Sequence, residues 1–313
     1  MKELCEILKI YYPIIQGGMG NISNAELTAA VSEAGGLGTI GVGTMSPQEV
    51  EQIIKETNGR TGKPFAVNIP ITVTPYLKEM LELIMKHKVP VVSLSAGNPA
   101  PFIKMLQEKG IKVIIVCASV KQAKKAELAG ADIIVAEGYE AAGINSALET
   151  TTLTLIPQIA DQVNVPVVAA GGIGDGRGLA AMLMLGASGV QMGTRFIATK
   201  EAPFHENYKA QLLAANDHGT TVVGRSVGRI RRILRTAYSE KLKAIEEKGN
   251  QHEKFEQMTT ETYHKYGALN GSFEEGFMNS GQVAGLINDI PLVKDLLERM
   301  MQEAREVIHR HNT

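Results

Sequence analysis

The chain has 313 residues, of which 44% are hydrophobic and 21% charged, and its formal net charge is −1. This composition is typical of a globular protein, and the near-neutral charge argues against nucleic acid or an anionic membrane as a partner. Cys5 and Cys117 are too few for a disulfide framework, and no apolar run reaches the roughly 18 residues of a membrane span. Because the N-terminus is charged where a signal peptide needs apolar residues, we expect a soluble, cytoplasmic protein.

Short apolar runs alternate with longer amphipathic segments through the first part of the chain. We expect strands at 13–16, 37–41, 65–69, 90–95, 112–117, 132–136, 166–171 and 189–193. The segments between them resemble helices, and Asn24 and Ser46 stand at N-cap positions. Strands that are apolar throughout are typical of a parallel sheet covered on both faces. Eight such strand–helix units most simply close into an α/β structure of the (β/α)8 TIM barrel type, with a doubly wound open sheet as the alternative.

The pattern changes after residue 200, where the chain becomes more polar. We expect residues 1–214 to form the barrel, 215–277 a smaller, mainly helical cap inserted after the eighth strand, and 278–313 helices that rejoin the barrel. The cap contains the basic run "GRSVGRIRRILR" at 224–235. Two interpretations of this run remain open: a solvated helix face, or a contact for a phosphate-bearing arm of the substrate.

Two glycine-rich loops follow the last two expected strands, at the end of a barrel where catalytic loops lie. "GGIGDGRG" spans 171–178 and "GTRF" spans 193–196, and each leads into an expected helix. Backbone N–H groups of glycine loops and the positive end of a helix dipole both attract phosphate. The two loops therefore favour a phosphate cradle over simple tight turns.

A third glycine pattern, "GGLGTIG" at 35–41, matches the G-x-G-x-x-G of dinucleotide-binding folds. That motif requires its glycines between a strand and a helix, whereas here we expect a strand to run through them. We expect no dinucleotide site at this position.

A phosphate site at this end of a barrel suits either a sugar phosphate or a flavin mononucleotide. Isomerase or aldolase chemistry on a sugar phosphate needs a Lys, Glu or His on a strand, whereas a flat flavin ring needs small residues and amides around it. The loops "QGGMG" (16–20) and "EAAG" (140–143), with Asn68 at the end of the third strand, are of the second kind. They favour the flavin.

Several longer blocks are similar to the FMN-dependent nitronate monooxygenase family, also called the 2-nitropropane dioxygenase family. They are "YPIIQGGM", "FAVNI", "AGNP", "AEGYEAAG", "PVVAAGGIGDGRGLAAMLMLGASGVQMGTRF", "HENYK", "GRSVG" and "FMNSGQ". The family includes the bacterial enoyl-acyl-carrier-protein reductase II and an NADH:quinone reductase branch. The resemblance runs along essentially the whole chain.

The resemblance implies FMN at the C-terminal mouth of the barrel, with NADH or NADPH as reductant and no metal. Ring contacts are implied for Gly18, Met19, Asn68, Lys112, Ala142 and Gly143, phosphate contacts for Gly171, Gly172, Gly193 and Thr194, and a contact from the returning cap segment for Gln282. Members of the family tend to pair, so a homodimer is an assembly to consider.

Three functions remain open within the family. The first is NAD(P)H-driven reduction of an enoyl thioester, free or bound to an acyl carrier, or of a quinone-like acceptor. The second is oxidation of alkyl nitronates with O2, and the third is flavin binding with little turnover. Arg225, in the "GRSVG" block, is the expected substrate contact. Cys117 has no histidine near it in sequence, and we expect a small buried side chain rather than a nucleophile.

The loop "EGYEAAGINS" at 137–146 departs from the family pattern, in which a histidine follows the glycine. Ile144 stands at that position and cannot exchange a proton, whereas an imidazole titrates near neutrality and serves as a base. We expect Tyr139, a water held by Asn145, or His264 in the cap to deliver any proton that the product needs. Because hydride transfer requires no base, the departure favours a reductase with little activity on neutral nitroalkanes.

Overall fold

The computed structural model describes residues 1–249 and 251–310, and its centre is a sheet of eight parallel strands. These strands are β1 (Ile14–Gln16), β2 (Gly38–Gly41), β3 (Phe65–Pro70), β4 (Val91–Ser95), β5 (Lys112–Cys117), β6 (Ile133–Glu137), β8 (Val167–Ala170) and β9 (Gly189–Met192). Each begins and ends within one residue or two of the strand expected from the apolar runs.

The sheet closes on itself. Its strands follow the order β1-β9-β8-β6-β5-β4-β3-β2, and a parallel bridge between Ile15 and Leu37 joins the two ends. At this seam the Gln16 N–H donates to the Leu37 carbonyl at 2.9 Å, and the Leu37 N–H donates to the Ile14 carbonyl at 3.0 Å. The predicted TIM barrel is therefore confirmed, and the open-sheet alternative is wrong.

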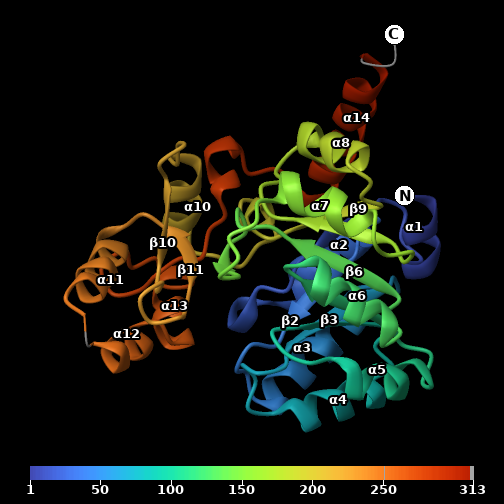
Figure 1. Ribbon diagram of the computed structural model, residues 1–313, viewed down its shortest axis with the longest axis horizontal. Helices are drawn as coiled ribbons and strands as arrows, with labels where there is room; N and C mark the ends of the chain where they lie inside the picture. The colour runs from blue at the N-terminus through green and yellow to red at the C-terminus, as the bar shows by residue number, and fades with distance from the viewer. Residues whose placement is uncertain (250, 311–313) are drawn as a thin grey trace.

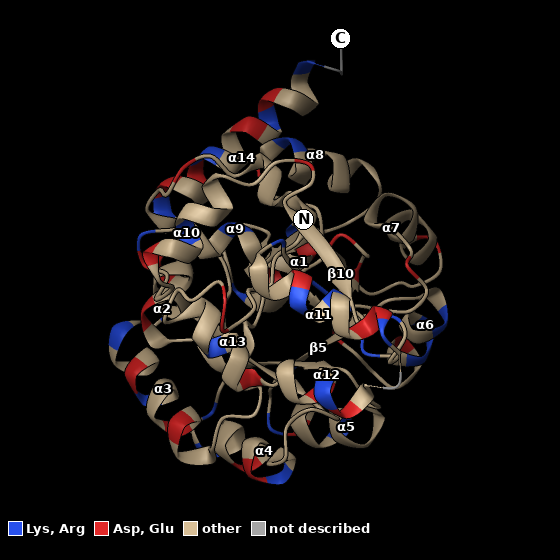
Figure 2. Ribbon diagram, turned by 90° about the vertical axis from the view of Figure 1, so that its left-hand side faces the viewer, with Lys and Arg blue, Asp and Glu red and all other residues tan. Residues whose placement is uncertain are grey.

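Helices surround the barrel, as Figure 2 shows from the cap side. They are α2 (Ala25–Glu33), α3 (Pro47–Arg60), α4 (Leu77–Lys86), α5 (Ala100–Gln107), α6 (Val120–Leu128), α7 (Thr152–Ala160), α8 (Gly176–Met184) and the short α9 (Thr194–Ile197). Both expected N-caps are present. Asn24 accepts a hydrogen bond from the Leu27 N–H at 3.1 Å, and Ser46 forms a capping box with Glu49.

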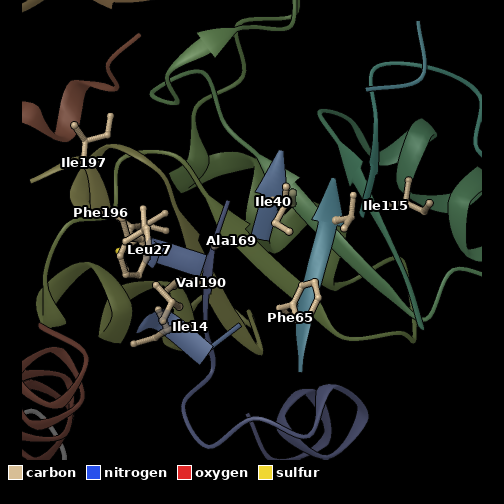
Figure 3. Packing of buried hydrophobic residues seen from close by; sticks show 14 of the residues in the cluster. Ile14, Leu27, Ile40, Phe65, Ile115, Ala169, Val190, Phe196 and Ile197 are labelled. Carbon is tan, nitrogen blue, oxygen red and sulfur yellow. The ribbon is translucent and has the colours of Figure 1, made fainter. Parts of the chain in front are cut away.

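Alternation along the strands divides the hydrophobic core into two shells. Inward-facing side chains such as Ile15, Ala66 and Val135 fill the barrel, and Leu4 and Leu8 of α1 (Lys2–Leu8) close its floor. Outward-facing strand side chains pack against residues of the surrounding helices, and Figure 3 labels members of both groups, such as Ile40 and Val190 of the strands and Leu27 of α2. Full burial of one such aliphatic side chain contributes about 1.5–3 kcal/mol, so the many buried strand positions hold the barrel closed.

The last four residues of the glycine pattern at 35–41 form β2, and no helix begins directly after them. A strand runs through Gly38 and Gly41, as expected. A Cβ at Gly38 would collide with the backbone of Thr28 in α2, so this glycine permits close packing of helix on strand.

The cap combines helices with a small antiparallel sheet that the sequence did not predict. Its strands are β10 (Thr220–Val223), β11 (Arg231–Leu234) and β7 (Gly143–Ile144), and its helices are α11 (Ala237–Glu247), α12 (His252–Met258) and α13 (Glu261–Ala268). β11 lies within the basic run 224–235, so the helix-face interpretation is wrong there. β7 belongs to the loop that follows β6, which ties the barrel directly to the cap.

The cap has a hydrophobic cluster of its own and lies at one end of the barrel (Figure 1). The cluster includes Val223, Ile233, Tyr238, Phe255 and Phe277. The chain enters the cap through α10 (Glu206–Leu213) and leaves it through η2 (Gln282–Leu286).

The last helix, α14 (Val293–Arg310), packs against α8 of the barrel. There Glu303 accepts a hydrogen bond from the Gly176 N–H at 2.9 Å. Within the described ranges, no helix is both long and apolar enough to cross a membrane.

Candidate active site

A cavity of about 470 Å³ opens at the carboxyl ends of the barrel strands, beneath the cap. This size lies in the range of about 300–1,000 Å³ that is usual for ligand pockets. Loops after β1, β3, β4, β5, β6, β8 and β9 line it, together with α13 and the returning segment around 279–283. Figure 2 shows the cap helices α11, α12 and α13 over this end of the barrel.

The glycine loops after β8 and β9 are shaped to hold an anion. Gly171 and Gly172 have φ of 98° and 74°, which favours glycine, and a Cβ at Gly171 would lie 2.9 Å from the Gly138 carbonyl oxygen. A Cβ at Gly193 would meet nothing within 4 Å, so space is open above it. Among the described residues, the N–H groups of Gly172 and Gly193 find no hydrogen-bond acceptor. These free donors fit a phosphate group.

The start of α8 does not contribute to this cradle, contrary to the expectation from the sequence. Asp175 caps the helix and accepts hydrogen bonds from the N–H groups of Arg177 (3.0 Å) and Gly178 (3.1 Å). A carboxylate already occupies the positive end of the helix dipole. Any phosphate is therefore left to the glycine loops themselves.

Small residues and one fixed amide line the neighbouring part of the cavity. A Cβ at Gly18 would lie 2.8 Å from the Cβ of Asn68, so no larger residue fits there. The Asn68 amide nitrogen donates to the Ser93 hydroxyl at 3.2 Å and the Ser95 hydroxyl at 3.3 Å, which fixes its orientation. Gly18, Met19, Asn68, Ala142, Gly143, Gly171, Gly172, Gly193 and Thr194 all line the cavity. This lining fits a flat ring that carries a phosphate.

Two expected cofactor contacts lie elsewhere. Lys112 is the first residue of β5, at the opposite end of the barrel from the cavity, and its Nζ lies 2.9 Å from Asp132 Oδ1. Gln282 is exposed, and its neighbours Gly281 and Val283 line the cavity instead. The expectation for Lys112 is wrong because only the last residues of a barrel strand reach the mouth.

Tyr139 and Arg225 meet at the lip but do not line the cavity. The Tyr139 hydroxyl donates to Glu149 at 3.0 Å, and Arg225 Nε donates to the same carboxylate oxygen at 2.7 Å. Partial burial and the hydrogen bond to Glu149 raise the pKa of Tyr139. Arg232 lies over the tyrosine ring at 4.9 Å. This position is unsuited to protonating a product inside the cavity, so the expectation for Tyr139 is wrong.

Asn145 lines the cavity, but its amide nitrogen is already occupied. Nδ2 donates to the carbonyls of Ala141 (3.0 Å) and Gly143 (2.9 Å), which holds the turn before β7. Only the side-chain oxygen of Asn145 is left to bind a water. Ile144 beside it also lines the cavity and is 55% exposed.

His264 lines the cavity from α13 without any movement of the cap. It is 2% exposed and stacks on Phe277 at 5.2 Å. The Asn279 amide donates to His264 Nε2 at 3.2 Å, which places the ring proton on Nδ1, where it donates to Glu261 at 3.3 Å. Burial alone would raise the pKa of Glu261, but the hydrogen bond from His264 and the nearby cations outweigh it and lower that pKa. Both ring nitrogens are thus engaged.

The structure adds two ionisable residues that the sequence did not single out. Glu137 ends β6 and lines the cavity, and burial raises the pKa of its carboxyl to about 7. Arg231 lines the cavity from β11 and is 9% exposed. The sequence did not single out Arg231 because it is one of several arginines in a basic run. Only the alternation of side chains between the two faces of β11 distinguishes it from its neighbours. Within the described ranges, no cluster of three or more His, Cys, Asp or Glu is arranged to hold a metal.

Solved structures of similar proteins share this architecture. FabK from Thermotoga maritima superposes with a TM-score of 0.95 at 41% sequence identity, covering 99% of this chain and 97% of that one.

Curated relatives match over nearly the whole chain as well. A (3aS,4S,5R,7aS)-5-hydroxy-7a-methyl-1-oxo-octahydro-1H-indene-4-carboxyl-CoA dehydrogenase from Rhodococcus jostii (strain RHA1) is 33% identical, covering 96% of this chain and 95% of that protein. A probable nitronate monooxygenase from Staphylococcus saprophyticus is also 33% identical, covering 97% of this chain and 98% of that protein.

The family model described as nitronate monooxygenase matches residues 1–80 and 70–303. The relatives are oxidoreductases, and the glycine loops of the cavity fit a flavin phosphate. The chain belongs to the nitronate monooxygenase family of flavin-dependent oxidoreductases.

Proposed function

We propose that the protein binds FMN and uses NADH or NADPH to reduce an enoyl thioester or a quinone-like acceptor. The observation that carries this proposal is Ile144, which lines the cavity at the position where the family pattern has a histidine. The Asn145 amide nitrogen is held by backbone carbonyls, and both ring nitrogens of His264 are engaged. Abstraction of a proton from a nitroalkane needs a base, and without the imidazole this task would fall to Glu137, which lines the cavity with a pKa raised to about 7. Hydride transfer needs no base, so the reductase reaction does not depend on Glu137.

The residues of the chain would hold the cofactor rather than react with it. The N–H groups of Gly172 and Gly193 would bind the phosphate, and Asn68, fixed by two serines, would orient the edge of the ring. FMN supplies the two-electron chemistry when it is bound. Arg231 and His264, both less than a tenth exposed, limit the access of water from the cap side.

Two similarities support a thioester as the substrate class. The Rhodococcus jostii relative is named for a carboxyl-CoA substrate, which is a thioester. The similarity to FabK from Thermotoga maritima is the second, since the family resemblance includes enoyl-acyl-carrier-protein reductase II. A small-molecule thioester and one bound to an acyl carrier are both compatible with a cavity that opens to solvent at the lip.

Oxidation of alkyl nitronates with O2 is the second candidate. A nitronate is already deprotonated and needs no base, and the cation of Arg231 in the cavity suits its charge. The staphylococcal relative carries the name of this activity. Flavin binding with little turnover is the third candidate and would leave both reactions slow.

Anaerobic reduction of the FMN-loaded protein, followed by flavin absorbance, separates the three candidates. We expect NADH or NADPH to bleach the flavin and crotonyl thioester or a quinone to restore its colour. We also expect kcat/KM for neutral nitroethane to lie below that for the better nucleotide. Bleaching by a nitronate but by neither nucleotide would establish the second candidate, and no bleaching would establish the third.

A further inference from the structure

Arg231 is a buried cation without a polar partner. The residue is 9% exposed, its Nη1 is fully buried, and none of its guanidinium nitrogens hydrogen-bonds or ion-pairs within the described part of the chain. Its guanidinium lies over the ring of Phe277, whose centroid is 4.6 Å from Cζ. An arginine side chain presents five N–H donors and stays protonated in proteins, so a strong donor set is left free.

The strand pairing aims this donor set at the cavity. Successive side chains of a strand point to opposite faces, and Arg232 lies over Tyr139 outside the cavity. Arg231 therefore takes the other face and lines the cavity. Its Cα is the register partner of Ile144, so the two side chains leave the same face of the sheet.

The charges around Arg231 leave room for one more anion. The charge of Glu261 acts on Arg231, but Glu261 does not come within ion-pair distance and instead accepts from His264 at 3.3 Å. Asn279 donates to the other side of that ring, so its amide nitrogen is engaged as well. Burying an unpaired charge costs several kcal/mol, and a bound anion with matching acceptors would offset that cost.

We propose that Arg231 forms a binding site for a negatively charged oxygen of the substrate. Three ligand chemistries share that feature: a carboxylate, a nitronate, and the enolate oxygen of a thioester. The site supplies a permanent positive charge where related proteins place a titratable imidazole. Only the enolate rests on the proposed reductase function, because the other two anions bind without turnover.

Ligand-observed NMR titration of the oxidised, FMN-loaded protein tests this site without any reaction. We expect crotonate to bind at least about tenfold more tightly than neutral crotonamide, equivalent to about 1.4 kcal/mol, because only crotonate can form charge-assisted hydrogen bonds with Arg231. Arg231→Met should abolish the preference, and Arg231→Lys should keep part of it. Arg229→Met is the matched control, because Arg229 is exposed and pairs with Glu256 at 3.2 Å.

A second, anaerobic arm compares ethylnitronate with nitroethane. A preference for both anions shows a site for charged oxygen in general, and a preference for crotonate alone restricts it to carboxylate and thioester chemistry. The proposal is overturned if the wild-type protein shows no preference, or if Arg231→Met retains it. It is also overturned if Arg231→Met and Arg231→Lys both lose FMN, which would assign Arg231 to the cofactor. Slow reduction by NADH would count against the reductase function and leave this result unaffected.

Discussion

Arg231 of the cap lies directly opposite Ile144 of the barrel loop in the antiparallel pairing of β11 with β7. The same pairing sets Arg232 opposite Gly143, which lines the cavity with a φ of 73°. The cap and the loop after β6 thus form one sheet, and the cavity wall is made by both. Substitutions in either strand are expected to change the cavity as well as the cap.

Gly193→Ala tests the phosphate cradle. A methyl group at Gly193 meets no protein atom within 4 Å, so the fold should tolerate it, while the methyl would occupy space above the free N–H. We expect the Kd for FMN to rise at least about tenfold with little change in Tm of the FMN-free protein, because close backbone approach to the anion is lost. Fluorescence titration with FMN measures this. Gly62→Ala, also without contacts, is the control, and equal FMN affinity in both variants would contradict the cradle.

Cys117→Ala should retain most of the activity. The side chain is 3% exposed, and burial raises the pKa of its thiol to about 12, so the nucleophilic thiolate is absent near neutrality. Although Cys117 lines the cavity, we expect it to contribute packing alone. Steady-state rates with NADH should change by less than about tenfold, equivalent to about 1.4 kcal/mol. A larger loss at unchanged FMN content would show a direct chemical role.

Arg225→Ala should weaken substrate binding without loss of FMN. The Arg225 side chain is half exposed at the lip and already pairs with Glu149 at 2.7 Å. A phosphate-bearing arm of the substrate would therefore bind Arg225 together with Glu149. We expect KM for the nucleotide or the thioester to rise about three- to tenfold, the usual value of one exposed charge contact. Arg229→Ala, which pairs with Glu256, controls for the general charge of the cap. Loss of bound FMN in Arg225→Ala alone would move this residue to a cofactor or folding role.

Glu137→Gln should alter the dependence of stability on pH. The pKa of Glu137 is raised by burial from 4.5 to about 7, so between these values the native state binds a proton that the unfolded chain releases. The free energy of unfolding therefore falls as the pH rises from 4.5 to about 7, because the proton held by Glu137 is lost. The amide cannot ionise, so we expect the variant to gain stability relative to wild type from pH 5 to pH 8, by less than about 3 kcal/mol. Urea unfolding at both pH values measures the difference, and a constant difference would contradict the raised pKa.

The sequence predicted the barrel better than it predicted the site wall. Uninterrupted apolar runs identify buried parallel strands locally, and the caps at Asn24 and Ser46 depend on neighbouring residues alone. The β7–β11 pairing joins a two-residue strand to a segment far along the chain, so no local period indicates it. The burial of Arg231 depends on that pairing, so the sequence pattern did not predict it either. Lys112 was misplaced because it was assigned from the family resemblance, although its place at the start of the apolar run puts it at the end of the barrel away from the mouth.

Ile144→His tests whether the missing imidazole limits the chemistry. A histidine at this position would lie beside Arg231, whose charge lowers the pKa of the introduced ring and keeps it neutral, the form that accepts a proton. A positioned base contributes about 10²–10⁴-fold, so we expect kcat/KM for nitroethane to rise at least about tenfold. Reduction by NADH, which needs no base, should change little.

Ethylnitronate provides the internal control for this substitution, because it has already lost its proton and should gain little from the new base. Leu148→His is the matched variant, since Leu148 is exposed in the same loop and does not line the cavity. Rates with nitroethane, ethylnitronate and NADH are measured at equal FMN content across pH 6–9. Two outcomes would contradict this prediction: unchanged nitroethane turnover in Ile144→His, or an equal rise in Leu148→His. In either case the residue at position 144 does not decide between reductase and nitroalkane chemistry. Ile144 would then no longer support the proposed reductase function.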